Sequence, residues 1–262
     1  MSIWYAKGIL IYCCCMAAVL GAVFGSFLNC AAWRIAHGES FLKGHSRCPA
    51  CNHALGPADL IPVFSWVFQR GRCRYCGDKI SVRYPLTELF FALVTVLCLL
   101  RFDLTILCLR NWIFLCCLFC LALVDLESYI IPDGCLLIAA GAWAAALPFL
   151  RPGWGAIGRC VLAGVLFGGG MLLISLIMDK LLKKESLGGG DIKLFAVVGL
   201  YLGVIGTLFS LMLACVLGLA FALLRGAARE GKAIPFGPAI SMAAAFMLLY
   251  GEGMVNWYLH LF

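Results

Sequence analysis

Two aspartates stand at the ends of long apolar stretches: Asp125 in LALVDLESYIIPD and Asp191 in ESLGGGDIK. Only 13 of the 262 residues are acidic, and a carboxylate beside lipid is costly enough to require a structural or chemical role. Two carboxylates brought together cannot both ionise cheaply, so they share a proton, one acting as general base and the other as general acid. Such a pair can activate water for attack on a peptide carbonyl, which makes Asp125 and Asp191 candidate catalytic residues of an aspartic hydrolase.

Each aspartate taken alone has a simpler explanation. Asp125 can mark a membrane edge, although a carboxylate at a helix C-terminus opposes the helix dipole, and Asp191 can be an N-cap. The neighbouring sequence favours the chemical interpretation, because glycines 188–190 and the run Ile131-Pro132-Asp133 both interrupt regular helix. Irregular backbone at this depth is tolerated only where protein or a water-filled cavity surrounds it. The residues expected to form the supporting loops are Gly188, Gly190, Lys193, Pro132 and Asp133.

Four cysteines form a second chemical pattern, Cys48-Pro49-Ala50-Cys51 followed after 21 residues by Cys73-Arg74-Tyr75-Cys76. Two CxxC turns can complete a tetrahedral Zn²⁺ shell with Zn–S distances of about 2.3 Å, and four cysteines leave no open position for catalysis. We therefore expect a structural Zn²⁺ bound by Cys48, Cys51, Cys73 and Cys76. Two disulfides are the alternative, which a reducing cytosol disfavours.

The composition places these groups in a membrane protein. Hydrophobic residues make up 64% of the chain and charged residues 13%, which leaves too little polar surface for a soluble domain. The predicted fold is an all-α polytopic membrane protein with about eight transmembrane helices and a small zinc-binding cytoplasmic insert after the first helix. The predicted spans cover residues 8–34, 86–101, 104–124, 134–150, 157–178, 192–204, 207–224 and 236–255, and the sixth is short.

Lysine and arginine set the orientation through the positive-inside rule. With the N-terminus outside, the basic residues fall on the cytoplasmic side except for Lys7, Arg101, Arg110, Arg151 and Arg159. Both aspartates then lie at the cytoplasmic face. The net charge of +7 follows from this topology and does not indicate a nucleic-acid partner. The predicted domains are a first transmembrane helix (1–35), a cytoplasmic tetracysteine zinc insert (36–84) and a membrane aspartic peptidase domain (85–262).

Small residues in the spans are expected to pack helices against one another. Gly21 and Gly25 form a GxxxG motif, and Gly168 to Gly170 lie in the fifth span. Interfaces between membrane helices are enriched in such residues. A substrate groove is the alternative for these positions.

Several motifs occur together along nearly the whole chain: GSFLN at 25–29 followed by Arg34, CRYCGDKISVRYPLTELF from Cys73, Asp125 shortly before IPD, ESLGGGDIK, and IPFGP at 234–238. With these motifs the chain resembles the bacterial type IV prepilin peptidases, a family of membrane aspartic proteases of the GxGD kind that also N-methylate their product. The glycine-rich segment matches the family's E-x-x-G-x-G-D-x-K pattern.

The resemblance implies that Asp125 and Asp191 are the catalytic pair and that the substrates are type IV prepilins or type II secretion pseudopilins. It also implies cleavage after a leader glycine, methylation of the new amino group with S-adenosylmethionine as methyl donor, and location in a bacterial inner membrane. No methyl-donor residues are assigned, because no G-x-G-x-x-G opens a helix after a strand. We expect the methyl-donor site in the insert and at its junction with the first span.

Six of the 13 acidic residues gather in the two cytoplasmic segments that carry the pair: Asp125, Glu127, Asp133, Asp179, Glu185 and Asp191. Prepilin leaders are short and basic, so an acidic rim would concentrate them at the site. We hypothesise that Glu127 and Asp179 steer the leader. The alternative is pairing with neighbouring bases, in surface ion pairs worth under ~1 kcal/mol; these bases are Lys180, Lys183, Lys184 and Lys193.

Three other functions fit parts of the pattern. An intramembrane aspartic protease of the presenilin or signal-peptide-peptidase type also uses GxGD, but the tetracysteine insert and the FGP near the last spans favour the prepilin family. A proton-coupled transporter would carry acids near the bilayer midplane and an internal repeat, and the sequence shows neither. A non-catalytic scaffold held together by zinc is the third.

Overall fold

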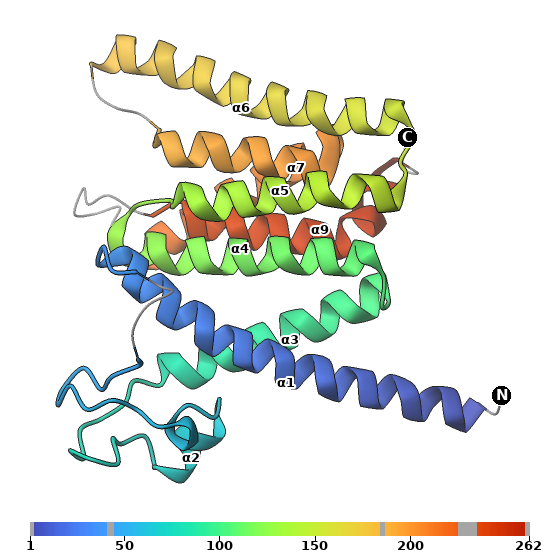
Figure 1. Cartoon of the computed structure of the whole chain (residues 1–262). Helices are drawn as coiled ribbons and strands as arrows, with labels where there is room; N and C mark the ends of the chain where they lie inside the picture. Colours follow the sequence, from blue (N-terminus) through green and yellow to red (C-terminus); the bar gives the residue numbers. More distant parts are fainter. Residues whose placement is uncertain (1–2, 41–44, 184–186, 225–234, 260–262) are drawn as a thin grey trace. The chain divides into compact units, whose positions relative to one another are not determined.

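The computed structural model describes residues 3–40, 45–183, 187–224 and 235–259, which form helices and two isolated β-bridges but no strand. Figure 1 shows these elements in the colours of the sequence. They are α1 (Ile3–Ala36), the 3₁₀ helix η1 (Pro57–Asp59), α2 (Phe64–Phe68), α3 (Arg83–Phe102), α4 (Ile106–Ser128), α5 (Asp133–Leu150), α6 (Trp154–Leu182), α7 (Gly189–Leu224) and α9 (Gly237–Leu259). The prediction of an all-α fold is confirmed for this part of the chain.

Six of the described helices are long and apolar enough to cross a membrane: α1, α3, α4, α5, α6 and α7. Each covers one of the predicted spans, and α7 covers two of them, the sixth and the seventh. The helix α9 covers the eighth predicted span. A multi-pass membrane protein follows from these helices, and the number of eight spans stays a prediction.

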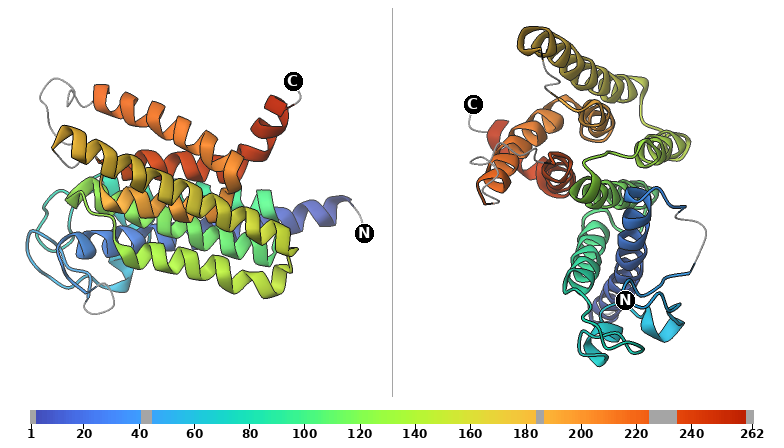
Figure 2. Two further views of the ribbon diagram at one scale, coloured as in Figure 1. Left: turned by 90° about the horizontal axis from the view of Figure 1, so that it is seen from above. Right: turned by 90° about the vertical axis from the view of Figure 1, so that its left-hand side faces the viewer.

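The helix α7 is interrupted at Gly203, whose φ of 66° and ψ of −174° are not helical. A straight helix of 36 residues would be about 54 Å long, nearly twice the hydrocarbon thickness of about 30 Å. The left view of Figure 2 shows the two halves of α7 running in different directions. Glycine suits the position because residues with a side chain rarely adopt positive φ.

The chain divides into two compact units, Met1–Cys108 and Leu109–Phe262. In the first unit, α1 lies along α3. A Cβ atom on Gly21 would lie 2.7 Å from the Cα of Ala92, and one on Gly25 would lie 3.1 Å from the Cα of Glu88. The two helices therefore approach through the missing side chains of the GxxxG motif, as predicted.

In the second unit, α7 packs against α5, α6 and α9. A Cβ atom on Gly168 would come within 2.7 Å of the Cβ of Ala196, so α6 and α7 are in close contact there. Gly169 and Gly170 are different, because a Cβ atom on either would meet none of the described residues within 4 Å. The packing prediction for this glycine run is confirmed at Gly168 and is wrong at the next two residues.

Gly168→Ala and Gly169→Ala should change stability in opposite directions. Alanine favours the helix at either position by up to ~1 kcal/mol over glycine. At position 168 its methyl group would meet Ala196, and overpacking of this kind costs about 1–3 kcal/mol. Thermal unfolding of both variants in the same detergent measures the difference. A Gly168→Ala protein as stable as Gly169→Ala would contradict the close contact between α6 and α7.

Candidate functional site

Asp125 lies in the penultimate turn of α4 and is buried, with 5% of its surface exposed. Its Oδ2 accepts a hydrogen bond of 2.9 Å from the backbone N–H of Gly237, the first residue of α9. The first N–H groups of a helix have no partner within the helix and favour a negative charge, so α9 supplies a binding site for this carboxylate. A Cβ atom on Gly237 would lie 2.7 Å from Oδ2, so the contact requires glycine.

Asp191 is half-buried in the first turn of α7, and its backbone N–H donates to the carbonyl of Gly188 at 3.0 Å. Its carboxyl group lies close enough to Asp125 for the two like charges to interact. The fold therefore brings together two aspartates that are far apart in the sequence. Neighbouring carboxylates of this kind can share one proton.

The boundaries of the two helices differ from those predicted. The helix α4 continues to Ser128, beyond the predicted end at residue 124, so Asp125 is inside the helix. The sixth span was predicted to start at residue 192, but α7 already begins at Gly189, so the alternative explanation of Asp191 as an N-cap is wrong. Both aspartates are held by regular helix and lie next to irregular segments, Asp125 before one and Asp191 after one, as the sequence predicted.

The interrupted segments predicted around the aspartates are present and touch each other. After α4 the chain turns at Tyr129, which has a φ of +58°, and α5 begins at Asp133 with Pro132 as its N-cap. A Cβ atom on Gly190 would lie 2.7 Å from the Cβ of Ile131. The missing side chain of Gly190 therefore lets the start of α7 contact the segment after α4. The surroundings of Gly188 are less tight than those of Gly190, since a Cβ atom added to Gly188 would lie 3.5 Å from Oδ2 of Asp191.

Lys193 and Asp133 form an ion pair between α7 and α5. The Nζ atom of Lys193 donates to Oδ1 and Oδ2 of Asp133 at 2.8 and 3.0 Å. More than half of each side chain is exposed, and exposed pairs of this kind contribute under ~1 kcal/mol. The pair connects the two helices at the rim of the site.

The two candidate leader-steering acids are in the second unit. Glu127 is half-buried in the last turn of α4, and Asp179 is half-buried on α6, where its Oδ2 accepts a hydrogen bond of 3.3 Å from the hydroxyl of Ser175. Glu185, a further acid of the proposed rim, and Lys184, a base that could pair with these acids, lie outside the described residues.

The four predicted cysteine ligands of the first unit meet in space. Their sulfur atoms all lie within 4.8 Å of one another, and those of Cys48 and Cys76 are 3.9 Å apart. Four sulfurs at about 2.3 Å from a central ion would be separated by about 3.8 Å, so this arrangement fits a tetrahedral metal. The backbone N–H of Cys51 lowers the pKa of the Cys48 thiol to about 7. At Cys76 the Asp78 N–H acts in the same direction, but burial and the three neighbouring thiols outweigh it and raise the pKa to about 12. These residues could therefore hold a metal ion.

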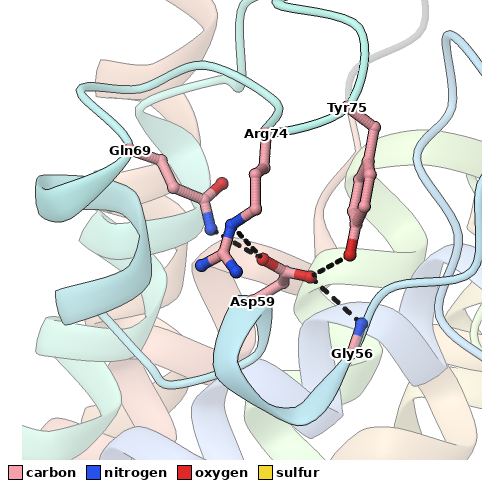
Figure 3. A network of polar contacts seen from close by, with 5 residues as sticks. All are labelled: Gly56, Asp59, Gln69, Arg74 and Tyr75. Atoms are coloured by element: carbon pink, nitrogen blue, oxygen red, sulfur yellow. Dashed lines mark hydrogen bonds and ion pairs between the residues drawn. The ribbon is translucent and has the colours of Figure 1, made fainter.

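Asp59 is the centre of a polar network in the insert, which Figure 3 shows. Its carboxylate accepts hydrogen bonds from the Gly56 N–H at 3.1 Å, from Nε2 of Gln69 at 3.0 Å and from the Tyr75 hydroxyl at 3.1 Å. It also pairs with Nε of Arg74 at 3.2 Å. Arg74 and Tyr75 stand between Cys73 and Cys76, so Asp59 connects η1 to the second CxxC turn. No local pattern predicts this role of Asp59, because its partners lie at four separate positions between residues 56 and 75.

Glu88 is a second residue that was missed. It lies in α3, is buried, and accepts a hydrogen bond of 2.7 Å from the backbone N–H of Val63 in the insert. Close by, the side-chain amide of Asn29 donates to the hydroxyl of Thr87 at 3.3 Å. The signal was present in the sequence, since Glu88 is the only acidic residue in the apolar stretch 86–101.

Comparison with known proteins places both units in described families. Residues 19–102 match the bacterial peptidase A24 N-terminal domain, and residues 112–223 match the type IV leader peptidase family. The prepilin leader peptidase/N-methyltransferase of Bacillus subtilis (strain 168) is 34% identical over 249 residues, which cover 92% of this chain and 96% of that protein. A protein of the same name from Aeromonas salmonicida (strain A449) is 36% identical over 224 residues, covering 82% of this chain and 74% of that protein.

A third relative is the type 4 prepilin-like proteins leader peptide-processing enzyme of Escherichia coli O78:H11. It is 33% identical over 258 residues, which cover 87% of this chain and 90% of that protein. No solved structure matches the chain.

Asp59→Ala should loosen the insert. The Asp59 side chain is almost fully buried, and removing it leaves the guanidinium of Arg74 and several donors without their acceptor, at a cost of about 3 kcal/mol. Hydrogen exchange of residues 56–76 in the full chain should become faster. The matched control is Asp78→Ala, because Asp78 is exposed and accepts a local hydrogen bond from the N–H of Lys79. Equal exchange in the two variants would show that Asp59 does not organise the insert.

Proposed function

Because the chain belongs to the type IV leader peptidase family, we propose that it removes the short basic leader from type IV prepilins or type II secretion pseudopilins and N-methylates the new N-terminal residue. Relatives that match most of its length carry names that state both activities. We place the enzyme in a bacterial inner membrane with its active site at the cytoplasmic face. The positive-inside rule supports this orientation.

The observation that supports peptide hydrolysis most directly is the meeting of Asp125 and Asp191. One carboxylate takes a proton from water, the water attacks the scissile carbonyl, and the other carboxyl group protonates the departing amine. The Gly237 N–H holds the Asp125 carboxylate in place. The proton belongs to the pair, so separate roles are not assigned to the two aspartates. Lys193, Asp133, Pro132, Gly188 and Gly190 support the loops around them.

The alternatives explain the site less well. A proton-coupled transporter carries its acids near the bilayer midplane, whereas Asp125 is near the C-terminal end of α4 and Asp191 is in the first turn of α7. A presenilin-like or signal-peptide-peptidase-like protease shares the GxGD motif, but the match to the leader peptidase family covers residues 112–223 and a companion domain covers 19–102. Both observations favour leader cleavage.

Methylation requires S-adenosylmethionine, which supplies the methyl group when bound. We place its site in the insert and its junction with α1, in the first unit.

Asp125→Asn and Asp191→Asn should each lower the rate of leader cleavage by roughly 10²–10⁴-fold, because each removes a group that transfers a proton. Purified protein is incubated with a prepilin, with and without S-adenosylmethionine, and the product is weighed by mass spectrometry. The unchanged enzyme should give a shortened product, heavier by one methyl group when the donor is present. Asp103→Asn is the control, since Asp103 is exposed in the turn between α3 and α4. Cleavage at the normal rate by either active-site variant would remove the proposed mechanism.

We also propose that the metal held by the four cysteines is a structural Zn²⁺. The chain should carry about one Zn²⁺, and binding can contribute on the order of 10 kcal/mol to folding of such a small insert. Cys73→Ser should lose the metal and expose the insert to proteases. Cys15→Ser is the matched control, because Cys15 is outside the cluster. Elemental analysis reports the metal, and disulfides at the four positions in the purified protein would contradict the proposal.

Glu127 and Asp179 are proposed to attract the basic leader. Glu127→Gln and Asp179→Asn should together slow cleavage of a prepilin with a basic leader at low salt by several-fold, and the difference should shrink at high salt as the charges are screened. A prepilin with a neutralised leader should be cleaved equally by both forms. Glu39→Gln, at an exposed acid just after α1, is the control. Equal rates on the basic leader at every ionic strength would refute the steering role.

A further inference from the structure

The insert exposes an apolar face on the short helix α2. Phe64, Val67 and Phe68 are exposed, and 81% of the Phe68 surface is accessible. Their spacing of three and four residues puts them on one side of the helix. The intervening Trp66 points the other way, donating its ring N–H to the carbonyl of Ile80 at 3.1 Å. Leu60 and Ile61, just before the helix, are exposed as well.

The position of α2 along α3 is fixed by a hydrogen bond. Val63, the residue before α2, donates its backbone N–H to Oε2 of Glu88 at 2.7 Å. Glu88 follows the first residue of α3, Arg83, by five positions, which corresponds to about 7.5 Å along the helix axis. The 20 residues of α3 span about 30 Å, the hydrocarbon thickness of a bilayer. With α3 crossing the hydrocarbon layer, this contact would put α2 near the edge of the acyl chains, and Figure 1 shows α2 beside the start of α3.

The backbone at this contact is unusual. Val63 has a φ of +62°, which a β-branched residue rarely adopts. The buried carboxylate of Glu88 holds this conformation by accepting the Val63 N–H. The hydrogen bond between Val63 and Glu88 thus fixes the position of the start of α2 along α3.

The charges that follow α2 suit an anionic surface. Arg70 and Arg72 are exposed directly after the helix, and a basic side chain near anionic lipid head groups contributes about 1 kcal/mol. Asp59, just before α2, is engaged by Arg74 and Tyr75. An apolar face flanked by exposed arginines is the pattern of a segment that lies in the membrane interface, buried about 5–10 Å.

We propose that α2 with Leu60 and Ile61 is an interfacial membrane anchor of the insert, its apolar face among the acyl chains and Arg70 and Arg72 at anionic head groups of the cytoplasmic leaflet. The insert then lies against the membrane surface instead of extending into water. This role is separate from both proposed activities and from the metal.

Photo-crosslinking in nanodiscs tests the anchor. The full chain carries p-benzoylphenylalanine at position 68 and is placed in nanodiscs of phosphatidylethanolamine and phosphatidylglycerol. After irradiation, mass spectrometry should find lipid attached to the peptide that contains position 68. The control has the same group at position 79, where Lys79 is exposed in the same insert, and should give little lipid adduct. The proposal would be overturned if position 68 formed no lipid adduct. It would also be overturned if position 68 crosslinked to protein instead, in the same chain or in a second copy.

A second arm separates the head groups from the acyl chains. Arg70→Gln with Arg72→Gln should lower the phosphatidylglycerol share of the adducts several-fold and leave adducts in nanodiscs of phosphatidylcholine unchanged. Phe64→Ser with Phe68→Ser should speed hydrogen exchange of residues 60–68 in nanodiscs. Retained metal in these variants shows that the insert remains folded. An unchanged hydrogen-exchange rate in the phenylalanine variant would contradict the anchor. An unchanged phosphatidylglycerol share of the adducts in the arginine variant would contradict it as well.

Discussion

Two carboxylates can share a site only where the backbone around them comes close enough to hold them, and in residues 109–262 that closeness depends on missing side chains. Gly237 brings the start of α9 onto Asp125, and Gly190 brings the start of α7 onto Ile131. Farther along α7, a Cβ atom on Gly199 would lie 2.6 Å from the backbone nitrogen of Gly164 on α6. In lipid there is no hydrophobic drive between helices, so close backbone contact is what holds such a unit together. The geometry of the aspartates therefore rests on glycines that do no chemistry themselves.

The sequence predicted the features that depend on local pattern. Apolar length marked the helices, the proline at 132 marked the break between α4 and α5, and the two CxxC turns marked a cluster that does form. The close approach of α1 and α3 followed from the GxxxG spacing. Each of these is decided within a few residues of chain, where propensity and spacing act directly.

The features that the sequence did not reveal are long-range contacts. Asp59 gathers four donors from three places in the insert, and nothing in its own surroundings distinguishes it from a turn aspartate. The role of Gly237 as a hydrogen-bond donor to Asp125 joins residues 112 positions apart. Gly168 and Gly169 are adjacent and identical in type, yet only the first faces a neighbouring helix among the described residues. Periodicity does not resolve which of two neighbouring glycines faces the contact.

The break at Gly203 leaves the first half of α7, residues 189–202, only about 21 Å long. A rod of this length falls short of the hydrocarbon layer, and a bilayer beside it thins or is kept away by other helices, at a cost of fractions of a kcal/mol per Å of mismatch. Asp191 stands in the first turn of this rod. One of the two carboxylates is thus carried by a helix segment shorter than the hydrocarbon layer, the kind of segment for which bilayer thickness is a physical variable.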